Sequence, residues 1–255
     1  MKYPTAHAEA LRRAAVSLAC CAALSSLANA QEASPVEDSP IRSYFLIDQL
    51  EHTSSRDAND TRATALRFNT AGWIGGDYNR VWIYTEGTKP SNGKLKDLDV
   101  QLLYGRLIAP FWDLQAGVRY FKPRPDSPSR SSAVFGIQGL APYRFAVQAA
   151  AFVSERGDVS ARAELEYELL FTQRWVLQSR FATNVALQTV KQLGIGRGVN
   201  DVELGVRLRY EIKREFAPYV GLSWRSSYGQ TAEFARERGD VVRGLSVVAG
   251  IRAWF

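Results

Sequence analysis

Two stretches of the sequence alternate apolar and polar residues almost without interruption, and they limit the fold more than any other feature. Residues 158–169 read DVSARAELEYEL, and residues 201–213 read DVELGVRLRYEIK. Strict alternation predicts a β-strand with one apolar face and one polar face. Both stretches exceed the ~5–6 residues of a typical soluble strand and suit the ~9–11 tilted residues that cross a bilayer. We therefore predict membrane-spanning strands, with apolar side chains toward lipid and polar side chains toward a lumen.

The same alternation recurs about twelve times along residues 43–255, which predicts a transmembrane antiparallel up-and-down β-barrel. We expect strands near 44–52, 65–74, 80–86, 98–107, 112–121, 132–139, 145–154, 158–169, 174–188, 201–213, 217–227 and 244–255. Tight turns such as 75–78 alternate with longer connections such as 189–200, as in bacterial outer-membrane barrels. An even number of strands places both chain termini on the periplasmic side. The alternative is a soluble lipocalin-like barrel, whose lumen would be apolar and whose outer surface would be polar.

The first thirty residues are expected to be a cleaved signal peptide and to take no part in the fold. Lys2, Arg12 and Arg13 precede an apolar core at 14–27, and Ala28-Asn29-Ala30 forms a small-x-small cleavage site. Residues 31–42 would then be a short periplasmic tail, and residues 43–255 would be the barrel. Cleavage would remove both cysteines and the single methionine, so we expect no disulfide and no sulfur ligand in the mature chain.

Charge and apolar content exclude two other classes of protein. The formal net charge is +6, but acidic and basic residues interleave within the predicted strands, whereas a nucleic-acid-binding protein would gather its basic residues in a patch. After the signal peptide we find no run of ~18 apolar residues that would form a transmembrane helix.

Aromatic residues lie near the ends of the predicted strands, where interfacial girdles are expected. They are Trp112, Trp175, Tyr210, Tyr219 and Phe255.

Several of these stretches resemble the copper resistance protein B family of outer-membrane proteins. They are residues 72–87 (GWIGGDYNRVWIYTEG), 102–120 (LLYGRLIAPFWDLQAGVRY), 136–178 and 204–224 (LGVRLRYEIKREFAPYVGLSW). The resemblance implies an outer-membrane barrel that contributes to copper tolerance by binding or passing copper ions, with no organic cofactor. It also implies periplasmic copper-handling proteins as partners, together with outer-membrane lipid. The terminal Phe255 resembles the signal that the barrel-assembly machinery reads.

This chain departs from the family pattern before the barrel. Family members commonly carry a periplasmic extension rich in methionine and histidine, whose soft ligands suit copper. Here residues 31–42 contain neither residue type. A copper role would therefore depend on the barrel alone.

The first predicted strand carries the one group that combines histidine with carboxylates, namely Asp48, Glu51 and His52. Asp48 and His52 would share a strand face about 13 Å apart along the chain, too far for one ion, so a metal site would need ligands from neighbouring strands. The alternative is a rim histidine without a ligand role.

A second candidate site is the luminal charged wall of the strands between 158 and 213. Its members are Arg162, Glu164, Glu166, Glu168, Arg180, Glu203, Arg207, Arg209 and Glu211. The hairpin register brings Arg180 near Glu164 or Glu166. These residues would either form a polar path that attracts cations or close the lumen by pairing with one another.

Three functions remain open at this stage. The first is a copper-binding or copper-passing barrel, and the second is a narrow general porin or structural barrel without metal specificity. The third is an outer-membrane lipid hydrolase, which is disfavoured because His52 is the sole possible base and no partnering serine stands out. We expect no catalysis and no nucleic-acid partner.

Overall fold

The computed structural model describes residues 40–56 and 62–255, so the predicted signal peptide and residues 31–39 of the predicted tail lie outside the described residues. Twelve strands of ten to fifteen residues make up most of the described chain. They are β1 (Arg42–Arg56), β2 (Arg62–Gly75), β3 (Asn79–Pro90), β4 (Lys96–Ala109), β5 (Trp112–Lys122), β6 (Arg130–Ala141), β7 (Phe145–Ser154), β8 (Val159–Leu170), β9 (Trp175–Ala186), β10 (Gly198–Tyr210), β11 (Phe216–Ser227) and β12 (Arg243–Trp254).

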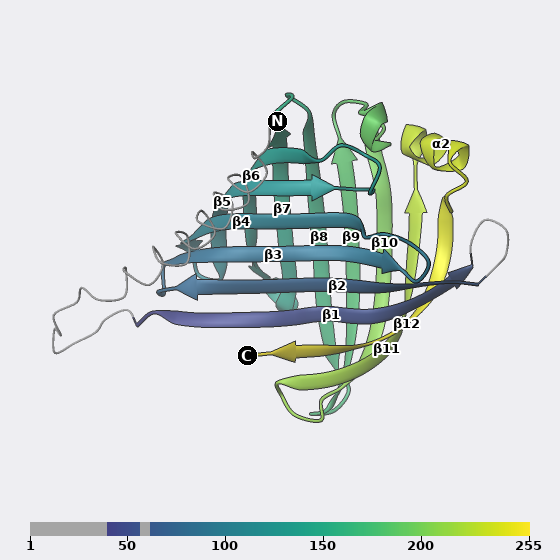
Figure 1. The fold of residues 1–255 in the computed structure, drawn as a ribbon. Helices are drawn as coiled ribbons and strands as arrows, with labels where there is room; N and C mark the ends of the chain where they lie inside the picture. The colour runs from purple at the N-terminus through teal and green to yellow at the C-terminus, as the bar shows by residue number, and fades with distance from the viewer. Residues whose placement is uncertain (1–39, 57–61) are drawn as a thin grey trace, which may run out of the picture. The chain divides into compact units, whose positions relative to one another are not determined.

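The strands form one closed, antiparallel, up-and-down barrel (Figure 1). Each strand pairs with its neighbours in sequence, and β1 pairs with β12 to close the ring, for example through Thr53 and Val248. Closure removes exposed sheet edges, which a bilayer does not tolerate. The predicted fold is therefore confirmed, with the third and fourth strands extending several residues further than the sequence pattern indicated.

The two faces of the sheet have opposite polarity to those of a soluble barrel. On β5, Leu114 and Val118 point outward and are 53% and 61% exposed, whereas Gln115 between them is 2% exposed. The largest fully buried side chains include Arg207, Arg209, Gln49 and Glu51. A polar interior inside an apolar wall excludes the lipocalin-like alternative and fits a membrane barrel.

The connections differ at the two ends of the barrel. One end has short turns, among them the 3-10 turn η2 (Pro142–Arg144). The other end has longer loops that contain the 3-10 turn η3 (Lys191–Leu193) and the helix α2 (Gly229–Glu237), visible beyond the strands in Figure 1. In the described part of the chain, no helix is long and apolar enough to cross a bilayer.

Two details of the sequence pattern were wrong. The tenth strand ends at Tyr210 and not at Lys213, because a bend follows and Lys213 makes only an isolated bridge to Phe216. Tyr219 does not belong to an interfacial girdle: it is 5% exposed, and its hydroxyl lies in the lumen. Trp175 and Tyr210 do meet on the outer surface, with ring centroids 4.8 Å apart.

A row of aromatic rings lines the inside of the barrel near the short turns, and the sequence pattern did not indicate it. Neighbouring ring centroids lie 5.8 to 6.4 Å apart. The row comprises Trp254, Tyr44, Trp73, Trp82 and Tyr84. These rings fill the lumen beside the charged groups described next.

Candidate luminal ion-pair site and vestibule

An arginine on β8 crosses the lumen to a carboxylate on β3. Arg162 donates from Nη1 and Nη2 to the two carboxylate oxygens of Glu86 at 2.8 and 2.9 Å, and from Nε to Glu164 at 2.5 Å. Arg180 of β9 donates to the other oxygen of Glu164 at 2.6 Å. Because β3 and β8 lie nearly opposite each other in the ring, this chain of charges ties two distant walls together.

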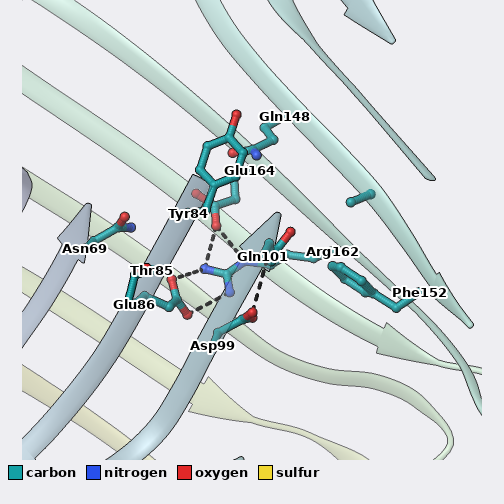
Figure 2. Close-up of a pocket in the computed structure, with 11 residues that line it drawn as sticks. Asn69, Tyr84, Thr85, Glu86, Asp99, Gln101, Gln148, Phe152, Arg162 and Glu164 are labelled. Carbon is teal, nitrogen blue, oxygen red and sulfur yellow. Dashed lines mark hydrogen bonds and ion pairs between the residues drawn. The ribbon is translucent and has the colours of Figure 1, made fainter. Parts of the chain in front are cut away.

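A small cavity of about 50 Å³ borders this ion pair, and Figure 2 shows the residues around it. Asp99 faces the cavity and is held by Arg119 at 2.6 Å and by the amide of Gln101 at 3.3 Å. The guanidinium of Arg119 also lies over the rings of Phe121 and Phe152, 4.5 and 4.0 Å from their centroids. Cation–π contacts and the ion pair fix this arginine in one place.

Two further ion pairs join β10 to strands that are not its neighbours. Arg67 of β2 pairs with Glu203, and Arg207 donates two hydrogen bonds of 3.0 Å to Glu51 of β1. The hydroxyl of Tyr219 also donates to Glu51, at 3.1 Å. Glu51 and Arg207 are each 1% exposed, so the pair is buried, and removal of one partner would leave an uncompensated charge.

The half of the lumen nearer the short turns holds the remaining predicted wall residues. Arg209 donates to Glu168 at 3.0 Å and to Glu211 at 3.4 Å, and Glu166 accepts a hydrogen bond from Gln178. All nine residues of the predicted luminal charged wall therefore contact lumen-side partners. The arrangement is one of mutual pairing across and along the wall.

The long-loop end of the barrel contains a cavity of about 570 Å³, which we call the vestibule. Its floor includes Glu86 and Arg162, and its upper wall includes residues of η3 and α2. Asp97, Asp201 and Glu203 line it, and all three carboxylates interact electrostatically with Arg225. The Arg162–Glu86 pair thus separates the vestibule from the small cavity beside Tyr84.

The structure does not bring together the predicted group of Asp48, Glu51 and His52. Asp48 pairs with Arg252 at 3.1 Å and Glu51 pairs with Arg207, both inside the lumen. His52 is exposed on the outer face, opposite Leu66 and Ala249. The expected common face of Asp48 and His52 fails because β1 carries a β-bulge after Ile47, which shifts the alternation by one residue.

Two residues of the vestibule, Asp97 and Arg225, were not predicted from the sequence to be site residues. Asp97 adopts a left-handed backbone conformation (φ 53°), and its carboxylate forms no hydrogen bond or ion pair with the described residues. Arg225 has a half-exposed side chain that reaches into the vestibule. Neither feature has a local sequence signature, because both depend on which side chains of β4, β10 and β11 face each other across the lumen.

Together, the closed barrel, the apolar outer wall and the charged lumen define a bacterial outer-membrane β-barrel. Among solved structures, a NanC porin aligns with a TM-score of 0.50 over 80% of this chain and 99% of the porin, at 11% sequence identity. At that identity the likeness concerns the fold alone.

The sequence comparisons identify the family. Residues 41–255 match the family model described as copper resistance protein B precursor (CopB), and the chain belongs to this family. It is 42% identical over 221 residues to the copper resistance protein B of Escherichia coli, covering 86% of this chain and 72% of that protein. A copper resistance protein B homolog of Pseudomonas syringae pv. tomato shows the same identity and coverage. The chain is therefore located in the bacterial outer membrane. Barrels of this class have their short turns on the periplasmic side.

Proposed function

We propose that this barrel contributes to copper resistance by binding copper ions in its extracellular vestibule. The main support for the proposal is that three carboxylates of the vestibule, Asp97, Asp201 and Glu203, all interact electrostatically with Arg225. Membership of the copper resistance protein B family indicates that the metal is copper. Copper would then be a bound or transported ion and not a resident cofactor.

Asp97 is the carboxylate best suited to start copper binding. It is half-buried, and no arginine or hydrogen-bond donor among the described residues is bound to it. A left-handed conformation is unfavourable for a residue with a Cβ, by about 1–3 kcal/mol, and such strain gathers at functional sites. The backbone therefore holds in the vestibule a carboxylate that forms no hydrogen bond or ion pair with the described residues.

The other two carboxylates are occupied by protein groups. Glu203 pairs with Arg67 and Arg225, and Asp201 accepts a hydrogen bond from Asn184 at 3.0 Å. Among residues 40–56 and 62–255, no group of three or more His, Cys, Asp and Glu side chains is arranged to hold a metal ion. Copper would therefore have to displace Arg225, whose side chain is half-exposed and donates two hydrogen bonds to Glu203.

Carboxylate oxygens alone would give this site little selectivity among divalent metal ions. Oxygen ligands bind most divalent ions, but Cu²⁺ forms the strongest complexes in the first-row series at a given site. Specificity for copper would then depend on periplasmic copper-handling partners as well as on the vestibule. The role is non-catalytic, and passage to the periplasm would require the Arg162–Glu86 pair to open.

A narrow general porin or structural barrel is the second candidate. The observation in its favour is that many of the luminal charges are already neutralised by ion pairs, such as Arg162–Glu86, Arg207–Glu51 and Arg209–Glu168. Such a barrel would keep the family fold without handling metal.

Growth on copper tests the proposed function. A copper-sensitive strain that lacks its own copy would be complemented with the wild-type gene, the Asp97→Asn/Asp201→Asn double variant, or the Asp126→Asn control. Asp126 is an exposed loop carboxylate that does not line the vestibule. We expect wild type and control to restore growth on copper and the double variant to fail, at equal barrel levels in the outer membrane. Equal rescue by all three would contradict the proposal, and entry of uncharged solutes without any copper phenotype would favour the porin.

A further inference from the structure

Two arginines from separate loops converge on Gly194 in the roof of the vestibule. A Cβ atom placed on this glycine would lie 2.7 Å from Nη1 of Arg238 and 3.0 Å from Nη1 of Arg124. The two guanidinium groups therefore approach the same point, although like charges repel each other. Gly194 ends η3 in a left-handed conformation (φ 72°), which leaves the space open.

Hydrogen bonds hold both arginines in place. Arg124 donates to the η3 loop, from Nη1 to the carbonyl of Leu193 at 3.1 Å and from Nη2 to the carbonyl of Gln192 at 3.4 Å. Arg238 donates from Nε to Asp240 of its own loop at 3.0 Å. Thr231 of α2 accepts a hydrogen bond of 2.8 Å from the backbone N–H of Gly196. The loops around η3 and α2 thus form a fixed frame, and both guanidinium groups line the vestibule.

A third arginine lines the same cavity with unused donors. Arg130 of β6 is 5% exposed, and its Nε and Nη1 have no hydrogen-bond acceptor. Its nearest carboxylate is that of Asp158, with an Nε to Oδ2 distance of 3.5 Å. A buried guanidinium with free donors is unfavourable unless a ligand or ordered water completes its hydrogen bonds.

We infer that the vestibule contains an anion-binding site formed by Arg124, Arg130 and Arg238. The ligand class is a small soluble oxyanion that bears carboxylate or phosphate groups, because the planar guanidinium matches both in geometry and charge. The neighbouring carboxylates do not occupy all the hydrogen-bond donors of Arg124 and Arg238. Asp240 contacts Arg238 through Nε, and Asp126 lies 3.8 Å from Nε of Arg124 with a largely exposed side chain.

The anion site is independent of the proposed copper role, since it uses other residues on the roof and wall of the vestibule. The ligand would come from the extracellular medium through the loop end. Lipid phosphates are a second source of the same chemistry, so the measurement must be made in a detergent without phosphate and repeated with added anionic lipid.

Calorimetric titration of the refolded barrel with inorganic phosphate, and separately with citrate, tests the site. The variants are Arg130→Gln and the Arg124→Gln/Arg238→Gln double variant. The control is Arg236→Gln, which removes an exposed arginine of α2 that does not line the vestibule. Both substitutions of the double variant lie in loops, so this variant still tests the site if Arg130→Gln impairs folding. Folding of each variant is checked on gels, where the folded, unheated barrel migrates faster than the heated one.

We expect wild type and Arg236→Gln to bind at least one of the two anions, and both test variants to bind about tenfold more weakly or not at all. Absence of binding by wild type, or equal affinities in all variants, would overturn the inference. Binding of anionic lipid alone, without phosphate or citrate, would also overturn it.

Discussion

Arg162 of β8 and Glu86 of β3 form a two-pronged ion pair across the lumen, with N···O distances of 2.8 and 2.9 Å. The two strands are nearly opposite each other in the barrel, so the pair joins distant walls at the floor of the vestibule. Figure 2 shows Glu86, Arg162 and Glu164 meeting around the small cavity below. The lumen is thereby divided into an outer vestibule and an inner, aromatic-lined half.

This ion pair is expected to couple the stabilities of the two strands. In a double-mutant cycle of Glu86→Gln and Arg162→Gln, we expect a coupling energy of about 1–3 kcal/mol, because the side chains are largely buried and share two hydrogen bonds. Urea unfolding in lipid vesicles measures the four stabilities. Glu233→Gln and Arg236→Gln on the exposed helix α2 form the control pair, with an expected coupling of at most about 0.5 kcal/mol. Equal coupling in both pairs would contradict the structural role.

Removal of the arginine is expected to open the lumen. Arg162→Ala deletes the side chain that spans the vestibule floor, so single-channel conductance in planar bilayers should rise above that of the wild-type barrel. Arg236→Ala, a matched loss of one positive charge outside the lumen, should leave the conductance unchanged. If Arg162→Ala conducts no better than wild type, another constriction closes the barrel.

Tyr219 should stabilise the buried pair of Glu51 and Arg207. Tyr219→Phe removes the hydroxyl that donates to Glu51 at 3.1 Å, and a hydrogen bond to a charged group is worth about 1.5–3 kcal/mol. The free energy of unfolding in lipid should fall by this amount. Tyr120→Phe is the control, because Tyr120 faces outward and is 42% exposed. A loss for Tyr219→Phe no larger than for the control would contradict this assignment.

Arg225 is expected to compete with metal ions for the vestibule carboxylates. Arg225→Gln should strengthen Cu²⁺ binding by about two- to fivefold, because an ion pair with a partly exposed arginine is worth up to about 1 kcal/mol. Competition titration with a coloured chelator measures the change. Arg236→Gln should leave the affinity as it is. Weaker copper binding in Arg225→Gln would show that this arginine supports the site and does not block it.

The architecture could be predicted because a membrane barrel imposes a period of two on every strand. The alternation in 158–169 places Arg162 and Glu164 on one face, and the hairpin register then places Arg180 beside them, as in the structure. The outward apolar face of β5 follows in the same way. The strand count follows from the same alternation, which recurs about twelve times along residues 43–255.

Local distortions of the strands and contacts across the lumen could not be predicted. The β-bulge in β1 reverses the orientation expected for His52, because a bulge depends on pairing with β2 and β12 and not on local sequence. The partners of Arg162 and Arg207 lie on strands far away in sequence, and alternation specifies a face without specifying a contact. For the same reason the sequence gives no sign of the left-handed Asp97 or of the arginines above Gly194.

Calorimetric titration of Cu²⁺ into the refolded barrel tests whether the vestibule binds copper, with wild type, Asp97→Asn and His52→Ala measured side by side and Zn²⁺ as the comparison metal. We predict about micromolar copper binding that exceeds zinc binding, at least about tenfold weaker in Asp97→Asn and unchanged in His52→Ala, since His52 faces lipid. Absence of copper binding by wild type, or copper binding that Asp97→Asn leaves intact, would contradict a copper site at Asp97 in the vestibule.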